Sequence, residues 1–98
     1  MVTSIENMKT NKGGYASNQF IVYSTEGVYF ISYQSVIAFK PINSITRYIG
    51  SDYDYSRTTM RYLQKFLGHD IKETRKRLEA GVYKKLTKEQ EQSLILGE

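Results

Sequence analysis

The segment from Gln19 to Lys40 constrains the fold most, because it has the pattern of three β-strands separated by two tight turns. Its three apolar runs, rich in β-branched and aromatic residues, are Gln19–Ser24 (QFIVYS), Val28–Tyr33 (VYFISY) and Val36–Lys40 (VIAFK). Gly27 can take the positive φ that the first turn requires, and Gln34 and Ser35 should form the second turn. Pro41 should end the third strand, because proline cannot donate to a sheet ladder. We therefore predict an antiparallel meander.

Both faces of this meander are apolar, so each face needs cover. Strict alternation assigns one face to Phe20, Val22, Val28, Phe30, Val36 and Ala38, and the other to Ile21, Tyr23, Tyr29, Ile31, Ile37 and Phe39. Helices can cover one face. The other is then either semi-exposed or buried in a partner. Tyr23, Tyr29 and Tyr33 should lie on one side, and because tyrosine is common at binding hot spots they form a candidate protein or homodimer interface. The alternative is that they are ordinary core residues.

The rest of the chain predicts an α+β fold. A weaker run at Ile45–Ile49 is a candidate fourth strand. Helical periodicity begins at about residue 56, after a cap at Ser56 or Asp54, and the predicted inward residues are Met60, Leu63, Phe66 and Leu67. A second helix follows from Asp70 to about Ala80, and capping-box residues from Thr87 predict a short third helix to about Leu96.

We therefore predict an antiparallel three- to four-stranded meander sheet at about residues 18–50, followed by two to three helices at about residues 56–96. Residues 1–17 are polar and end in Lys12-Gly13-Gly14, which indicates a flexible N-terminal arm. Residues 18–98 should form a single domain, since 98 residues suffice for one domain and not two.

Positive charge is concentrated in the second half of the chain. From Arg57 to Lys88 the sequence has ten basic and three acidic residues, whereas residues 1–56 have four of each. Such a biased field steers a protein toward polyanions or acidic protein faces, although a solvated helical surface would have the same composition.

The residue inventory argues against catalysis and metal binding. There is no Cys, and His69 is the one His in the sequence. His69 lies between two predicted helices, where a local polar contact is its more ordinary role. Asp52 and Asp54 have the spacing that begins a calcium loop, but the Gly and the final Glu of that loop are missing. We predict no enzyme activity, no cofactor and no metal.

The basic residues of the predicted helices form the candidate nucleic-acid-binding site. They are Arg57, Arg61, Lys65, Lys72, Arg75, Lys76 and Arg77. The first three recur every four residues and should form one outward stripe. Tyr62 and Tyr83 interleave with these cations, and aromatic rings can stack on bases while Arg and Lys neutralise phosphates.

Two sequence blocks carry a resemblance to a known group. The strand-and-turn block Ser32–Lys40 (SYQSVIAFK) and the block Asp54–Leu67 (DYSRTTMRYLQKFL) together resemble small uncharacterised proteins of bacteriophages and mobile elements of Gram-positive bacteria. The resemblance covers about residues 18–68. It implies a phage or mobile-element origin but no mechanism, because no activity is known for the group. Ser56, Thr58 and Thr59 also have a structural role as helix-capping residues, which we favour over an active site.

The resulting functional hypothesis is a non-enzymatic accessory protein that binds nucleic acid through its basic helices. The alternative is an inhibitor that binds a host protein, for example a defence or replication factor, with homodimerisation compatible with either. No apolar stretch approaches the ~20 residues of a membrane-spanning helix, so we expect no membrane association and a location in the cytoplasm of the host bacterium.

Overall fold

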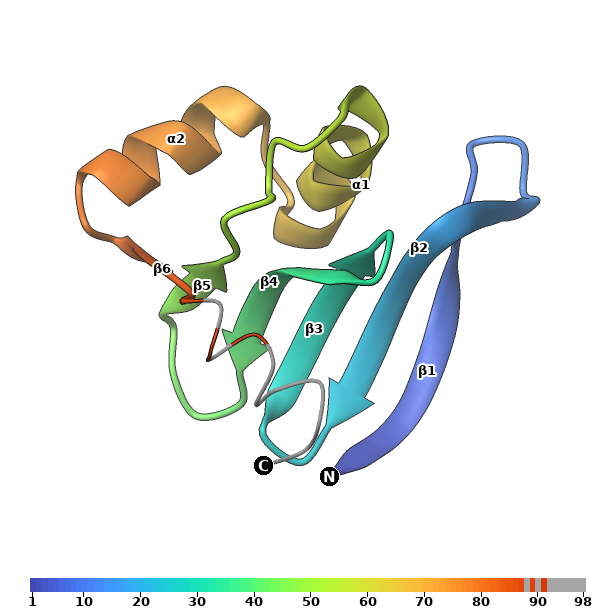
Figure 1. Cartoon of the computed structure of the whole chain (residues 1–98), viewed down its shortest axis with the longest axis horizontal. Helices are drawn as coiled ribbons and strands as arrows, with labels where there is room; N and C mark the ends of the chain where they lie inside the picture. The colour runs from blue at the N-terminus through green and yellow to red at the C-terminus, as the bar shows by residue number, and fades with distance from the viewer. Residues whose placement is uncertain (88, 90, 92–98) are drawn as a thin grey trace.

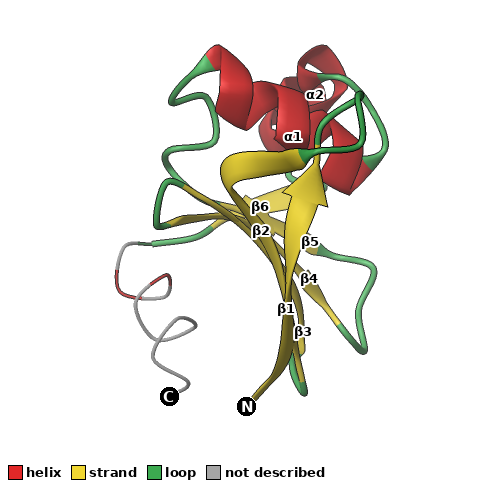
Figure 2. Ribbon diagram, turned by 90° about the vertical axis from the view of Figure 1, so that its right-hand side faces the viewer, coloured by secondary structure: helices red, strands yellow, loops and turns green. Residues whose placement is uncertain are grey.

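The computed structural model describes residues 1–87, 89 and 91, and these form an α+β fold (Figure 1). The elements in chain order are β1 (Val2–Lys9), β2 (Tyr15–Ser24), β3 (Gly27–Ser32), β4 (Ser35–Pro41), β5 (Arg47–Ile49), α1 (Arg57–Leu67), α2 (Ile71–Glu79) and β6 (Tyr83–Lys85). Within the described residues the strands form one sheet in the order β1-β2-β3-β4-β5-β6. Both helices gather at one end of this sheet (Figures 1 and 2).

The predicted meander is confirmed, and it is longer than expected. The three predicted strands are β2, β3 and β4, paired antiparallel, and the candidate fourth strand is the shorter β5. Six strands exceed the predicted three to four, because β1 and β6 lie at the two edges of the sheet. β6 pairs parallel to β5, and the chain between them forms the two helices.

The prediction of a flexible arm at residues 1–17 is wrong for most of that segment. β1 pairs antiparallel with β2, with Ile5 opposite Val22 and Asn7 opposite Phe20. Of its eight residues, Met8 alone is buried. An edge strand of this kind has backbone pairing without an apolar alternation, so the pattern that reveals β2 to β4 is missing from it.

The register of the sheet also corrects the predicted faces. Val22 lies opposite Tyr29, and Ile21 lies opposite Phe30. Residues directly opposite in an antiparallel pair share a face, so Val22 and Phe30 lie on different faces. A register shift after Phe30 changes the alternation again along β4.

Each face of the sheet has its own apolar cluster. On the helix side, Phe30, Ala38 and Ile49 pack with Leu63 and Phe66 of α1. On the other side the cluster consists of Val22, Tyr29, Val36, Phe39 and Leu86. Leu86 follows β6, so the segment after the last strand supplies cover to the second face.

The helix boundaries agree with the predicted capping residues. The Ser56 side chain accepts a hydrogen bond from the Thr59 amide, and Gly68 ends α1 in the left-handed region at φ 85°. Asp70 caps α2 in the same way, by accepting from the Glu73 amide. Leu63 and Phe66 are buried as expected. The predicted third helix, Thr87 to Leu96, lies largely outside the described residues.

Candidate nucleic-acid interface

The outward side of α1 carries three cations on successive turns. Arg57, Arg61 and Lys65 are all exposed, while Tyr62, Leu63 and Phe66 are buried against the sheet. Burial of that apolar side fixes the rotation of the helix, so the cations point to solvent. The sequence of α1 has no acidic residue. The predicted stripe therefore exists as an uninterrupted positive surface about 12 Å long, at a rise of about 1.5 Å per residue.

The β1–β2 hairpin extends this surface beyond Lys65. The Lys65 Nζ donates a hydrogen bond of 2.9 Å to Asn11 Oδ1 in the loop between β1 and β2. This contact places the hairpin, with its exposed Lys9 and Lys12, beside the last turn of α1. We call the set Lys9, Lys12, Arg57, Arg61 and Lys65 the α1–hairpin surface.

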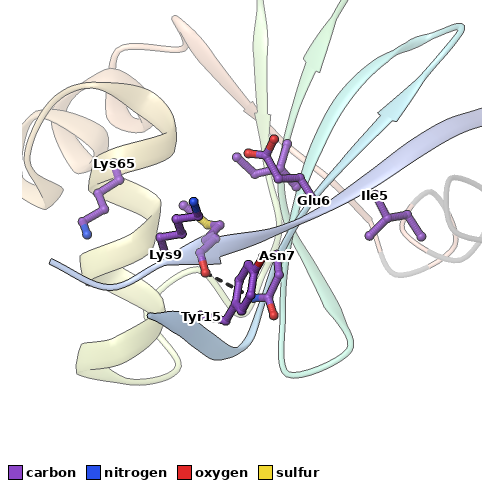
Figure 3. A pocket seen from close by; sticks show the side chains of 8 residues that line it. Ile5, Glu6, Asn7, Lys9, Tyr15 and Lys65 are labelled. Atoms are coloured by element: carbon purple, nitrogen blue, oxygen red, sulfur yellow. Dashed lines mark hydrogen bonds between the residues drawn. The ribbon is translucent and has the colours of Figure 1, made fainter. Parts of the chain in front are cut away.

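A groove of about 800 Å³ lies between the hairpin and α1. Its lining residues are Ile5, Glu6, Asn7, Met8, Lys9, Tyr15, Ile21 and Lys65. Figure 3 shows Lys65 of α1 near Lys9, with Glu6 and Tyr15 further along the groove. The Tyr15 ring is 72% exposed, and the Lys9 Nζ lies 5.9 Å from its centroid. The groove thus offers two cations, one carboxylate and an open aromatic face.

The wall of the groove is held in place by Asn7. Its Nδ2 donates to the carbonyl oxygens of Ala16 at 2.7 Å, Gln19 at 2.9 Å and Met8 at 3.2 Å. These bonds serve β2 where it departs from regular geometry, since Asn18 has a φ of 62°. The groove is therefore part of the folded sheet. Lys9 and Tyr15 were not predicted as site residues, because they lie in the segment that was predicted to be a flexible arm.

The cations of α2 do not join one face, contrary to the predicted grouping. Lys72 and Lys76 line a surface hollow together with Asp70 and Glu73. Arg75 lines a different hollow, which it shares with Lys85, Glu79, Tyr53 and Leu78. Each hollow contains at least one acidic residue, whereas the sequence of α1 contains none.

Arg77 is half-exposed, and its side chain contacts residues of α2 and β6. Its Nε donates to Glu73 Oε2 at 2.8 Å, and its guanidinium lies 5.5 Å from the Tyr83 ring centroid. The hydrogen bond from Arg77 lowers the pKa of the Glu73 carboxyl below its usual value, and the same bond raises the pKa of Arg77. Arg77 therefore links α2 to β6, and its guanidinium is more engaged than the cations of α1.

The two aromatic residues expected among the cations are buried. Tyr62 and Tyr83 are 5% and 6% exposed, so neither ring is open to a base. Lys65 lies over the Tyr62 ring at 4.9 Å. The Tyr83 hydroxyl contacts His69 Nε2 at 2.5 Å, which confirms His69 as a local polar contact. The exposed aromatic residues near the cations are Tyr15 and Tyr55, both missed by the sequence analysis.

Lys40 is a further cation that the fold uses internally. Its Nζ donates to the Phe66 carbonyl oxygen in the last turn of α1 and lies 4.2 Å from the Phe66 ring centroid. Burial lowers the pKa of Lys40, and the charge of Arg47 lowers it further. A cation at the carboxyl end of a helix stabilises its unpaired carbonyl groups.

The three tyrosines of the predicted protein interface are separated in the structure. Tyr29 is buried against Phe39, with ring centroids 4.8 Å apart. Tyr23 lies opposite Val28 and so points to the other face of the sheet from Tyr29. Tyr33 lies in the β3–β4 turn beside Tyr55. The prediction that they share one side is wrong, because it assumed a register that the strands do not adopt.

Among the described residues, no group of three His, Cys, Asp or Glu residues is arranged to hold a metal ion. No helix there is long and apolar enough to cross a membrane.

The two sequence blocks that carry the phage-protein resemblance meet in space. The Ser32 and Thr59 hydroxyls, one from each block, lie 2.9 Å apart, and the Tyr33 and Tyr55 rings are in contact. A comparison with protein families matches residues 3–81 to a family of unknown function, DUF8033. No curated protein and no solved structure matches the chain. The match spans the elements from β1 to the end of α2, and the chain belongs to this family of unknown function.

Proposed function

We propose that this protein is a non-enzymatic, cytoplasmic accessory protein of a phage or mobile element that binds nucleic acid through the α1–hairpin surface. The observation that carries the proposal is the Lys65–Asn11 contact, which joins the cations of the hairpin to the stripe on α1. Five cations then follow one continuous surface. Cationic surfaces of this kind bind phosphates and release counterions from the nucleic acid.

The groove beside this surface supports the proposal. Its two lysines can contact phosphate oxygens, and the exposed Tyr15 ring can pack against a sugar or base. Glu6 also lines the groove and would repel a phosphate, so the backbone should pass on the side of Lys9 and Lys65.

The test is fluorescence anisotropy with labelled single-stranded DNA, single-stranded RNA and duplex DNA at 50 and 200 mM salt. Five phosphate contacts predict that the logarithm of the binding constant falls with the logarithm of salt with a slope of about −3.5 on a single strand. The double variant Arg61→Glu/Lys65→Glu should weaken binding at least about tenfold, since it reverses two of the contacting charges.

The charge-matched control is Lys72→Glu/Lys76→Glu on α2, which changes net charge by the same amount at a different surface. It should weaken binding clearly less. Equal losses in the two variants would show that net charge alone governs the interaction, and no binding to any oligonucleotide at 50 mM salt would end the proposal.

Host-protein inhibition is the second candidate, favoured by an exposed apolar loop between β4 and β5. Ile42 and Ile45 are 66% and 95% exposed there. A host-protein complex that survives Arg61→Glu/Lys65→Glu and is lost on Ile42→Asp/Ile45→Asp would favour this candidate. The shared tyrosine face is no longer a basis for it.

A further inference from the structure

Two exposed tyrosine rings stand together just before the first turn of α1. Tyr33 and Tyr55 are 42% and 68% exposed, with ring centroids 6.0 Å apart and a 52° angle between the ring planes. Because the rings are tilted and do not stack flat, a large part of each ring surface is open to solvent. They come from different parts of the chain, the β3–β4 turn and the loop before α1.

The backbone at Tyr33 is held in a conformation that usually goes to Gly or Asn. Tyr33 and Gln34 have φ values of 50° and 70° in a two-residue turn. The turn directs the Tyr33 ring away from the sheet and toward Tyr55, at a conformational cost that a Gly or Asn would avoid. This position is consistent with a ring held for contact with another molecule.

A small polar pocket opens beside the tyrosine pair. It has a volume of about 150 Å³, and its lining residues are Ser32, Tyr33, Ser35, Ile37, Asp52 and Tyr55. Ser35 Oγ donates to Asp52 Oδ2 at 3.4 Å, so a hydroxyl and a carboxylate lie together in this pocket. Pockets for drug-sized ligands occupy about 300–1,000 Å³, so this one suits the edge of a single ring.

The pocket lies at the beginning of the cationic stripe. Arg57, the first residue of α1, follows Tyr55 by two residues, and Arg61 is one turn further along. A nucleic-acid strand whose phosphates lie on Arg57 and Arg61 would therefore pass close to Tyr55.

We propose that Tyr33 and Tyr55 form a stacking site for one unpaired nucleobase, with the base edge facing Ser35 and Asp52. This inference rests on the proposed nucleic-acid binding and deepens it, because it makes the partner a single strand. A paired base is already stacked in its duplex and has no free face for the tyrosines. Base–aromatic stacking accepts any base, so the site selects for strandedness more than for sequence.

The experiment compares two labelled 12-mers with the same number of phosphates, oligo-dT and an abasic strand of the same length. Tyr55→Ala should weaken binding of oligo-dT about five-fold or more and leave the abasic strand unchanged, because stacking requires a base. Tyr55→Phe retains the ring and should bind both strands as the parent protein does. Tyr55 is mostly exposed, so these variants should fold, which circular dichroism checks.

The outcomes separate this inference from the proposed function. Both proposals are supported if Arg61→Glu/Lys65→Glu weakens binding of both 12-mers and Tyr55→Ala weakens binding of oligo-dT alone. Equal effects of Tyr55→Ala on the two strands, or tighter binding of duplex than of oligo-dT, overturn the stacking site while the nucleic-acid function stands. If the parent protein binds no oligonucleotide, both proposals are wrong.

Discussion

A buried hydrogen bond between the Ser32 and Thr59 hydroxyls, 2.9 Å long, joins β3 to the first turn of α1. Ser32 is 2% exposed and Thr59 is fully buried, so neither hydroxyl can turn to water if its partner is removed. The Thr59 hydroxyl also accepts from the Ser56 hydroxyl at 3.2 Å. Ser32 and Ser56 are the chain neighbours of Tyr33 and Tyr55, so this small polar cluster helps to position α1 relative to the β3–β4 turn.

The stability lost on removing both hydroxyls should be smaller than the sum of the losses on removing each one alone. We expect Thr59→Val and Ser32→Ala each to lower the free energy of unfolding by about 1–3 kcal/mol, because each removes a hydrogen bond from a buried hydroxyl. The double variant should cost less than the sum. Urea unfolding followed by circular dichroism measures all three values, and additivity within about 0.5 kcal/mol would show that the two hydroxyls do not interact.

At the same scale, the sequence predicts which cations are present but not which of them are available. The four-residue spacing of Arg57, Arg61 and Lys65 correctly predicts an exposed stripe, because the inward residues of α1 are strongly apolar. Arg77 is also a cation on a predicted helix, yet Tyr83 and Glu73 engage it. That engagement depends on a contact between α2 and β6, which no local pattern reveals.

Among the elements, the β3–β4 pair depends on the backbone at Gly27. This residue has a φ of 150°, and a Cβ built on it would lie 2.2 Å from the Lys40 carbonyl oxygen and 2.9 Å from the Phe39 ring. The neighbouring atoms belong largely to the backbone of β4, so they cannot move aside without disturbing the sheet.

We therefore expect Gly27→Ala to destabilise the protein by about 4 kcal/mol or more, the range of backbone strain combined with overpacking. Gly14→Ala is the matched control, because a Cβ there meets Thr10 Oγ1 at an ordinary 3.8 Å. It should change stability by less than about 1 kcal/mol. Thermal unfolding of both variants checks the contrast, and similar melting temperatures would contradict the structural role assigned to Gly27.

How well an element can be predicted from sequence depends on how much of its side-chain surface is buried. β2, β3 and β4 bury side chains on both faces, and they were predicted to within a few residues. β1 buries Met8 alone, and β6 has three residues of which Tyr83 alone is buried, so both were missed. For such strands the main stabilising interactions are backbone hydrogen bonds to one neighbouring strand, and these leave no apolar alternation in the sequence.

For the whole molecule, β1 is an integral edge of the sheet and also one wall of the groove. Met8 packs into the core on the helix side, and Asn7 ties β1 to the beginning of β2. A removable arm would make neither contact.

Deletion of residues 1–9 should therefore lower the free energy of unfolding by about 3–5 kcal/mol, from the lost burial of Met8 and the lost hydrogen bonds of Asn7. It should also expose the edge of β2 and promote self-association. Urea unfolding and size-exclusion chromatography measure the two effects. An unchanged unfolding midpoint with a monomeric elution would restore the interpretation of this segment as an arm.

The parallel pairing of β6 with β5 has a consequence for the order in which the chain folds. Each strand from β1 to β5 pairs with its neighbour in sequence, so the meander can form by successive short loop closures. β6 reaches β5 only after the chain has passed through both helices. Closing that long loop is entropically costly, so a local meander nucleus should form first and β6 should dock late. The surface of α1 would then complete its contacts with the hairpin before the last edge of the sheet is closed.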